Sequence, residues 1–523
     1  MRLAYDVRAV RAAEQRAMDR LGDGVLMQRA ATGLAATTST AVGRVYGTRV
    51  VVLAGVGDNG GDALYAGALL ARRGARVDVL LMDEERVHSA GLEAVRRAGG
   101  RVARDPRAAA DADVVLDGLV GIGGKGGLRP EAAALVEPVG ADALVIAVDL
   151  PSGVDADTGE VAGQAVRADV TVTFGTFKPG LLVDPGAGRA GVVVLVDIGL
   201  EVGDFSAPGQ DGAPSARAWQ AADLRARLPR PTAESDKYAR GVVGVLAGST
   251  TYSGAAVLAV GGALRGGAGM VRAVSEPHVA IMVRHAWPEA VVTELDRDDD
   301  PRAAGRVQAW VAGPGIGTHA LAGTRLDAVL DSDVPVLVDA DGLTVLADRG
   351  AWPLDRSAPT LMTPHAGELA RLLGADRGDV EARRVAYVRR AADTLGATVL
   401  LKGSTTVICA PGERCVTVNP IGTPALATAG SGDVLSGLVG ALLAAGLPVA
   451  DAASAGAYLH ALAARLAAAG APITAGQVLE ALPSAYERVL GNDVDSRFGR
   501  LSSHRRGRVT AEGAFQVPRS TPV

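Results

Sequence analysis

The residues of this chain best suited to chemistry are two carboxylates beside glycine clusters. Asp149 directly follows the apolar run 143–148, and Asp433 ends the run 429–433, Ala-Gly-Ser-Gly-Asp. A positioned carboxylate can take a proton from a hydroxyl group, and glycines beside it let a ligand approach the backbone closely. Either acid could instead be a helix cap or a turn former. We therefore treat Asp149 and Asp433 as candidate acid–base groups, one in each half of the chain.

A glycine-rich run at residues 55–62, Gly-Val-Gly-Asp-Asn-Gly-Gly-Asp, separates the apolar run 49–54 from an alanine-rich stretch at 63–73. The apolar run is typical of a buried strand, and the stretch after it of a helix. Free N–H groups and the positive dipole end at the start of such a helix would suit a phosphate group. The run lacks the G-x-G-x-x-G spacing of dinucleotide-binding folds, and a tight turn without a ligand explains it equally well.

Three oxygen-bearing side chains follow neighbouring predicted strands: Asn59, Asp117 and Ser152. Parallel strands end at one edge of their sheet, so these side chains should converge there. Their oxygens would suit a monovalent or a hard divalent cation. The loop 117–127 is rich in glycine and carries Lys125 at its tip. A capping or turn-forming role is the better explanation for three other acids, Asp155, Asp157 and Asp169.

In the second half, the run 429–433 opens a predicted helix at 431–445, which would combine an anion-binding helix start with a base. Lys402 lies in a turn between predicted strands at 398–401 and 405–410, from which it could reach a phosphate group. His365 follows another predicted strand and could lie at the end of that strand, although a histidine packed in a turn is a comparable explanation.

Composition narrows the class of protein. The net charge of −5 makes nucleic acid an improbable partner. Only four of the 53 basic residues are lysine, which marks them as candidates for sites that need a compact ammonium: Lys125, Lys178, Lys237 and Lys402. The two cysteines, six residues apart, are expected to be reduced thiols. We see no signal sequence at the start, and the uncharged run 434–450 is expected to be a buried helix, so we expect a cytoplasmic protein without a membrane segment.

Apolar strands alternate with helical stretches in both halves, which predicts an α/β fold with two domains, each a mostly parallel sheet sandwiched by helices. Residues 201–216 are rich in Gly, Pro, Ser and Asp and are expected to form a linker. The predicted domains are residues 1–212 and 213–490. The Arg-rich residues 491–523 are expected to be a disordered tail.

The first half resembles the NAD(P)H-hydrate epimerase domain, a Rossmann-like fold, through runs 58–62, 117–127, 149–159 and 173–186. The family usually has two Asn before Gly-Gly-Asp, where this chain has Asp58 and Asn59. The resemblance implies a potassium ion held by Asn59, Asp117 and Ser152. It makes Asp149 the catalytic acid–base group, with Asp155 as second choice. It also implies that the hydrated nucleotide is bound by Asp58, Asn59, Gly60, Gly61, Asp62, Gly121, Ile122, Gly123, Gly124, Lys125, Gly126, Gly127 and Asp149.

Residues 220–485 resemble the ribokinase-like NAD(P)H-hydrate dehydratases. The resembling runs are 236–241, 251–259, 312–317, 339–343, 363–368, 401–406 and 419–433, where the family's Gly-Gly before Ser-Gly-Asp is Ala429-Gly430. The resemblance implies ADP as co-substrate, together with Mg²⁺, and Asp433 as the catalytic base. Implied contacts of the adenine nucleotide are Lys402, Gly403, Ser404, Thr405, Thr406 and Gly432. Implied contacts of the hydrate are Ala255, Gly315, His365 and Asp433.

Together the two resemblances predict a bifunctional repair enzyme for hydrated NADH and NADPH. The first half would interconvert the R and S hydrates, and the second would dehydrate the S form with ADP. The resemblance also makes a homo-oligomer plausible. One alternative is a ribokinase-like small-molecule kinase fused to a nucleotide-binding domain, which leaves the epimerase-like half unexplained. Another is a nucleotide-binding regulator without turnover, against which the two carboxylates count.

Overall fold

The computed structural model describes residues 1–202, 212–232, 234–297 and 299–491. The chain divides into two compact units, one from Leu3 to Ala216 and one that begins at Arg217. Most of the predicted linker and all but the first residue of the predicted tail lie outside the described residues. Two short strands lie near the unit boundaries in the sequence, β1 (Arg2–Ala4) and β9 (Ala216–Ala218).

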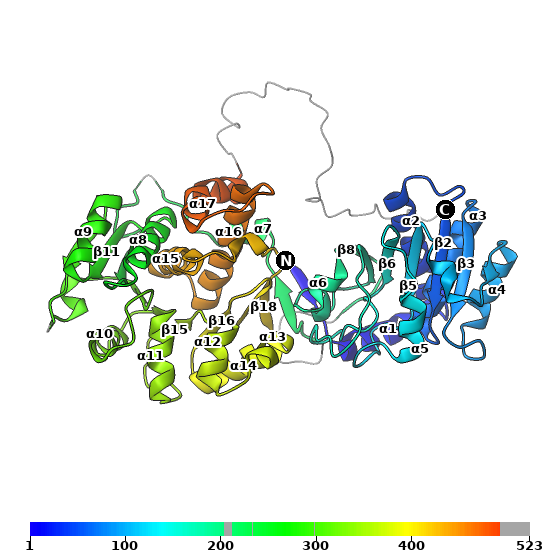
Figure 1. Ribbon diagram of the computed structural model, residues 1–523, viewed down its shortest axis with the longest axis horizontal. Helices are drawn as coiled ribbons and strands as arrows, with labels where there is room; N and C mark the ends of the chain where they lie inside the picture. The colour runs from blue at the N-terminus through cyan, green and yellow to red at the C-terminus, as the bar shows by residue number, and fades with distance from the viewer. Residues whose placement is uncertain (203–211, 233, 298, 492–523) are drawn as a thin grey trace, which may run out of the picture. The chain divides into compact units, whose positions relative to one another are not determined.

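The N-terminal unit, blue to cyan in Figure 1, is built on a sheet whose seven strands are all paired in parallel. From edge to edge they are β4 (Arg101–Val102), β3 (Arg76–Leu81), β2 (Arg49–Ala54), β5 (Val114–Gly118), β6 (Leu144–Val148), β7 (Val170–Phe174) and β8 (Val192–Val196). The helices are α1 (Val7–Leu21), α2 (Val25–Val42), α3 (Asp58–Arg72), α4 (Ser89–Arg97), α5 (Pro130–Val136) and α6 (Ala187–Ala190), with 3-10 turns η1 (Pro106–Ala109) and η2 (Pro179–Leu181).

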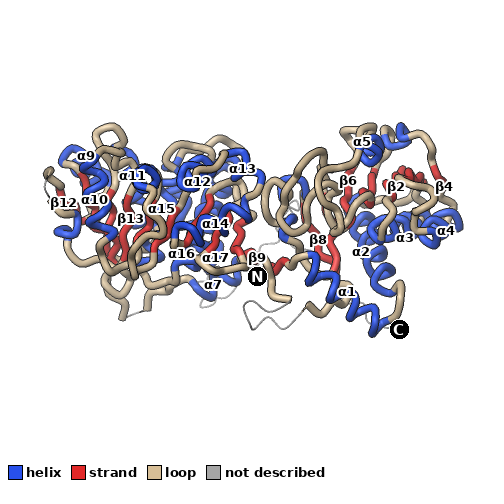
Figure 2. The backbone as a smooth tube through the Cα atoms, turned by 90° about the horizontal axis from the view of Figure 1, so that it is seen from below, coloured by secondary structure: helices blue, strands red, loops and turns tan. Residues whose placement is uncertain are grey.

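Alternation along β2 explains why both faces of this sheet are covered. Val50 and Val52 pack into an apolar cluster with residues of α2 and α3. Val51 and Leu53 point to the other face, where they pack with residues of α5. Figure 2 shows α2, α3 and α4 on one side of the strands and α5 on the other. The carboxyl ends of the central strands are left to the loops, which is where a ligand site belongs in a parallel sheet.

The second unit has a longer sheet. Seven parallel strands are followed by two antiparallel ones, in the order β12 (Val291–Glu294), β11 (Met270–Ser275), β10 (Val242–Leu246), β13 (Ala309–Ala312), β14 (Val336–Val338), β15 (Thr360–Met362), β16 (Thr398–Leu401), β17 (Thr406–Cys409) and β18 (Val416–Asn419). The helices are α7 (Ala221–Arg227), α8 (Ser253–Arg265), α9 (Pro277–Ala286), α10 (Ala320–Leu330), α11 (Asp341–Arg349), α12 (Ala366–Leu373), α13 (Arg377–Ala382), α14 (Arg384–Leu395), α15 (Ser431–Ala444), α16 (Val449–Ala468) and α17 (Ala475–Leu490), with 3-10 turns η3 (Pro301–Ala304) and η4 (Pro424–Leu426).

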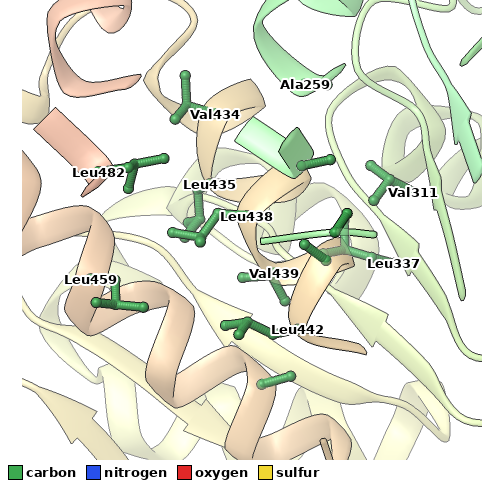
Figure 3. Packing of buried hydrophobic residues seen from close by; sticks show 14 of the residues in the cluster. Ala259, Val311, Leu337, Val434, Leu435, Leu438, Val439, Leu442, Leu459 and Leu482 are labelled. Atoms are coloured by element: carbon green, nitrogen blue, oxygen red, sulfur yellow. The ribbon is translucent and has the colours of Figure 1, made fainter. Parts of the chain in front are cut away.

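Helix α15 lies at the centre of the larger core. Figure 3 shows its apolar side chains among residues of the neighbouring helices and strands, such as Leu459, Leu482, Val311 and Leu337. Every residue of α15 from Val434 to Ala444 is buried, which confirms the expectation of a buried helix there. No helix among the described residues is long and apolar enough to cross a membrane. Figure 1 shows α15 to α17 on one side of the strands and α10, α11, α12 and α14 on the other.

The predicted fold class is confirmed: both units are mostly parallel sheets covered by helices. One element differs from the prediction. Helix α3 begins at Asp58, whereas the sequence indicated a turn up to residue 62. The reason is close packing, because a Cβ on Gly60 would lie 2.3 Å from the carbonyl oxygen of Gly55. The glycines therefore let the first helical turn sit against the end of β2, which propensity alone does not reveal.

Candidate active sites

A cavity of about 980 Å³ lies at the carboxyl ends of the strands of the N-terminal sheet. Most of the predicted epimerase residues line it: Asp58, Asn59, Asp62, all of 121–127 and Asp149. Gly60 and Gly61 do not line the cavity but are buried in the first turn of α3. Asp58 lies in that first turn and is exposed, and an acid in the first turn interacts favourably with the helix dipole.

Asp149 follows β6 and adopts a left-handed backbone conformation, with φ of 64°. Its Oδ1 accepts hydrogen bonds from Thr173 Oγ1 at 2.9 Å, from the backbone N of Phe174 at 3.2 Å and from Lys178 Nζ at 2.5 Å. Lys178 is 1% exposed, and its ammonium also reaches Thr173 Oγ1 and the carbonyl oxygen of Phe174. One carboxylate oxygen is thus fixed from behind by a buried cation, which leaves Oδ2 for a ligand.

Lys178 has no assigned role in the sequence analysis. Its only signal was the scarcity of lysine in the chain, which marked it as a candidate for a site that needs a compact ammonium. The structure gives the reason: three acceptors of different kinds surround one Nζ, a geometry that a planar guanidinium would not match.

Of the three predicted potassium ligands, Asn59 lines the cavity, whereas Asp117 and Ser152 are completely buried and do not line it. Ser152 donates to Asp117 through its Oγ at 2.6 Å and through its backbone N at 2.8 Å. Asn59 packs against Gly121, and its buried Nδ2 has no hydrogen-bond partner within the described part of the chain. Asp117 is completely buried, and burial raises its pKa to about 6 against the opposing hydrogen bonds from Ser152 and Leu119.

Lys125 forms ion pairs with two acids that the sequence analysis interpreted as helix caps or turn formers. Its Nζ lies 2.8 Å from Asp155 and 3.3 Å from Asp157. Asp155 also accepts hydrogen bonds from the backbone N of residues 157 and 158, and Asp169 accepts one from the backbone N of Val145. The contacts of Asp155 fit a turn-forming role. Asp157 and Asp169 instead accept hydrogen bonds from backbone N–H groups distant in the sequence, those of Val7 and Val145. The contact with Lys125 also places Asp155, the second choice for catalysis, in a pair with the loop lysine.

Besides Asp58 and Asp149, the carboxyl groups of Glu14 and Asp62 line the cavity. Glu14, on α1, is half-buried, and Asp62, on α3, is 9% exposed. Burial raises the pKa of Glu14 to about 7; the Lys178 ammonium opposes this shift, and Asp149 and Asp58 add to it. Burial likewise raises the pKa of Asp62 well above its usual range, with Asp149 and Asp58 adding to the effect. Sequence reasoning missed Glu14, because nothing in the pattern of α1 distinguishes it from a surface glutamate.

In the second unit, Asp433 lies in the first turn of α15. The helix begins directly after Gly430, which has a left-handed φ of 86°. Burial raises the pKa of Asp433 to about 7; the Asp339 carboxylate adds to the shift and the Lys402 ammonium opposes it. A carboxyl group with this pKa is ionised in about half of the molecules at neutral pH, which suits a general base.

Lys402 binds an acid to which the sequence analysis gave no role. Its Nζ lies 2.7 Å from Asp339 Oδ1 and 3.8 Å from Glu368 Oε2, and Asp339 Oδ2 accepts a hydrogen bond from Ser436 on α15. Asp339 follows β14 and is 1% exposed. A Cβ on Gly432 would lie 3.5 Å from Lys402 Nζ and 3.8 Å from Asp339 Oδ2. The predicted residues Lys402 and Gly432 therefore lie side by side, with Asp339 between the sheet and α15.

The predicted nucleotide residues Gly403, Ser404 and Thr405 form the turn between β16 and β17, and Thr406 is the first residue of β17. Arg384, a mostly buried residue of α14, donates to three carbonyl oxygens of this segment, those of Leu401, Lys402 and Thr405. A Cβ on Gly403 would lie 2.4 Å from the same guanidinium. The turn is therefore built around a buried arginine that the sequence did not identify.

The predicted hydrate contacts fall into two places. A Cβ on Gly315 would lie 2.8 Å from the Cβ atoms of both Ala255 and Tyr252, so Gly315 and Ala255 are neighbours. His365 caps α12: its Nδ1 accepts from the backbone N of Gly367 and Glu368, and its Nε2 lies 3.5 Å from Glu368 Oε1. Because Glu368 also approaches Lys402, His365 belongs to the polar cluster around that lysine.

The geometry of the two sites indicates the class of protein. Each unit carries a glycine-lined helix start and a partly buried carboxyl group near the carboxyl ends of a parallel sheet, an arrangement of two-domain α/β enzymes that act on nucleotides. A family model described as YjeF-related protein N-terminus matches residues 23–180, and one described as NAD(P)H-hydrate dehydratase matches residues 243–483.

Curated relatives cover most of the chain. The bifunctional NAD(P)H-hydrate repair enzyme Nnr of Mycobacterium tuberculosis is 50% identical over 454 residues, which cover 86% of this chain and 90% of the relative. The Corynebacterium glutamicum protein of the same name is 38% identical, over 76% of this chain and 78% of the relative. The chain belongs to the family of bifunctional NAD(P)H-hydrate repair enzymes. A solved ADP/ATP-dependent NAD(P)H-hydrate dehydratase from Bacillus subtilis is 30% identical and covers 52% of this chain and 99% of its own, with a TM-score of 0.48.

Proposed function

We propose that this chain repairs hydrated NADH and NADPH at two sites. Residues 1–212 would interconvert the R and S hydrates, and residues 213–490 would dehydrate the S form with ADP. The observation that carries the proposal is that both family regions retain a carboxyl group for chemistry, Asp149 in one and Asp433 in the other, each beside a buried or half-buried lysine. A kinase fused to a nucleotide-binding domain is not favoured, because it gives the Asp149 site no purpose.

At the epimerase site, the hydroxyl-bearing carbon of the hydrate is attached to the ring nitrogen. Its configuration can invert only when the C–O bond opens and re-forms, and both steps move protons. Asp149 lines the cavity, and its Oδ1 accepts a hydrogen bond from Lys178, so Oδ2 is left for the substrate. We therefore assign Asp149 as the acid–base group. The glycine loop 121–127 and the start of α3 would bind the phosphates and the rest of the nucleotide.

At the dehydratase site, Asp433 would take the proton of the hydrate hydroxyl as its oxygen attacks the terminal phosphate of ADP. Phosphate then leaves in place of hydroxide, and loss of a ring proton restores the dihydronicotinamide. Lys402 and the turn 403–406 would hold the nucleotide phosphates near Gly432. Within the described residues no group of three His, Cys, Asp or Glu side chains is spaced to hold a metal. Mg²⁺ would therefore be held mainly by phosphate oxygens.

Potassium is the cation we propose for the epimerase unit, held by Asn59, Asp117 and Ser152. The residues fit such an ion in one respect: among the described residues the completely buried Asp117 carboxylate forms no ion pair. A buried carboxylate is unstable without a nearby positive charge, and a bound cation would supply that charge to Asp117.

Potassium is expected to stabilise the wild-type chain against unfolding. An ion that binds only the folded state, present at about 100 times its dissociation constant, adds about 2.7 kcal/mol to the free energy of unfolding. The measurement is the melting temperature in potassium chloride against choline chloride at equal ionic strength. Asp117→Asn should lose this increment while its amide oxygen still accepts from Ser152 N. An equal shift in both proteins, or none in the wild type, would contradict the assignment.

The function itself is tested by the return of NADH absorbance. We expect an epimer mixture of hydrated NADH, mixed with the full chain, ADP and Mg²⁺, to be converted completely to NADH. A chain with only the dehydratase activity would stop at the S fraction, apart from spontaneous epimerisation, which is measured in parallel without protein. Absence of any ADP-dependent recovery would remove the dehydratase assignment and favour the kinase reading, and ADP binding without turnover would favour a regulator.

We also propose, from the family resemblance, that the chain acts in the cytoplasm as a homo-oligomer. Both cysteines are free thiols in the structure, Cys409 buried and Cys415 half-buried, which fits a reducing compartment. Light scattering of the purified full chain would give the oligomeric state directly.

A further inference from the structure

Glu14 is a carboxyl group in the epimerase cavity that the mechanism above does not use. It projects from α1, lines the cavity together with Asp149, and forms no hydrogen bond or ion pair with any described residue. The groups that act on it electrostatically come from every side of the cavity: Arg11 on its own helix, Asp58 and Asp62 on α3, Asp149 after β6 and Lys178 after β7. A half-buried carboxyl group without a partner, facing a ligand cavity, is free to contact the ligand.

Asp149 is poorly placed to do all the proton chemistry alone. Its Oδ1 is occupied by three donors, one of them the Lys178 ammonium, so the group is held as half of an ion pair. Giving a proton to a leaving hydroxyl requires a protonated acid. Burial, with Asp149 and Asp58 adding to it, raises the pKa of Glu14 to about 7, so this group carries a proton in about half of the molecules at that pH and in more of them below it. The cavity therefore holds a base that is paired with a cation and an acid that is not.

We propose that Glu14 is the general acid of the epimerase site and that Asp149 is its general base. This proposal rests on the proposed function, because it assigns a second catalytic residue to that same reaction.

Glu14 gives its proton to the hydroxyl oxygen of the hydrate, the C–O bond breaks with its electron pair on oxygen, and water leaves. The lone pair of the ring nitrogen forms a C=N bond to the same carbon, which becomes planar. A water molecule then adds to the opposite face and loses a proton to Asp149. That proton returns to Glu14 through water in the cavity, so the reaction consumes no net acid or base.

The test compares Glu14→Gln with the wild type in the full chain. The glutamine keeps the shape of the side chain and removes the proton, so kcat/KM for epimerisation should fall by about 10²-fold or more. Glu93→Gln is the matched control, since Glu93 is an exposed partner of Arg97 on α4. The ADP-dependent dehydration of pure S hydrate by the same molecules reports that the second unit is intact, and affinity for NADP⁺ reports whether the epimerase cavity keeps its shape.

The pH profile separates catalysis from packing. With Glu14 as acid, wild-type kcat/KM for epimerisation declines as pH rises through about 7, because the proton to be given is lost. The Glu14→Gln protein should show a low, flat rate over the same range, with NADP⁺ affinity within a few-fold of the wild type. Unchanged epimerisation in Glu14→Gln, or a loss of rate with the decline still present, overturns the assignment of Glu14. A wild type without epimerase activity would instead overturn the proposed function.

Discussion

An Asp433→Asn protein is expected to lose ADP-dependent recovery of NADH by at least about 10²-fold while it still binds ADP. The amide keeps the size of the side chain and the start of α15, but it cannot accept the proton of the attacking hydroxyl. Recovery of NADH from pure S hydrate gives the rate, and calorimetric titration gives ADP affinity. Because burial, together with Asp339, raises the pKa of Asp433 to about 7, the ionised base grows in population as pH rises. Wild-type dehydration should therefore increase from pH 6 to pH 8.

Asp333→Asn is a suitable control for this experiment, since Asp333 is an exposed residue between α10 and β14. It removes one carboxylate from the same unit and should leave recovery unchanged. If Asp433→Asn retained a rate within a few-fold of the wild type, the base would have to be another group. Asp339 is the obvious candidate, although its two oxygens already bind Lys402 and Ser436.

Asp149→Asn is the second substitution with a large expected effect, a loss of epimerisation of about 10²–10⁴-fold. Asn is a better test than Ala here. The backbone at this position has φ of 64°, which Asn and Asp tolerate better than most residues, and an Asn oxygen can still accept from Lys178. Both substitutions remove the negative charge beside the buried Lys178 ammonium, but alanine also removes the hydrogen-bond acceptor and would confuse misfolding with lost catalysis.

The measurement is the recovery of NADH from an epimer mixture. With Asp149→Asn, recovery should proceed rapidly through the S fraction and then continue only at the spontaneous rate. Rapid dehydration of the S fraction shows in the same trace that the second unit is intact. Asp111→Asn, an exposed acid beside η1, serves as the control and should recover both epimers. Complete rapid recovery by the Asp149→Asn protein would exclude Asp149 as an essential acid–base group.

The fold could be predicted from the sequence, and so could those site residues that directly follow a predicted strand or begin a predicted helix, because both depend on the order of residues over short segments. Apolar strand runs, and glycine clusters directly after them, place Asp149, Asp117 and Asp433 near strand ends or helix starts. The site residues that sequence reasoning missed lie far from these segments in the sequence and come close to them only in the folded chain. Glu14 comes from a helix that precedes the sheet, and Asp339 is recognised as a partner of Lys402 only when β14 and β16 lie near each other in one sheet.

A second kind of miss concerns packing at the backbone. The start of α3 at Asp58 depends on how closely Gly60 approaches Gly55, and no propensity scale describes that distance. Similarly, Arg384 resembles any other arginine of an exposed helix in the sequence. Only the fold shows its guanidinium beneath the turn that follows β16.

That arginine has a thermodynamic consequence for the dehydratase site. Its guanidinium holds three carbonyl oxygens of residues 401–405 before any ligand is present, so this segment has little conformational freedom left to lose. A flexible loop would offset part of each new phosphate contact by the entropy of ordering its own backbone. Here the loop is preorganised, and the free energy of the contacts it makes with a nucleotide can appear almost fully as affinity.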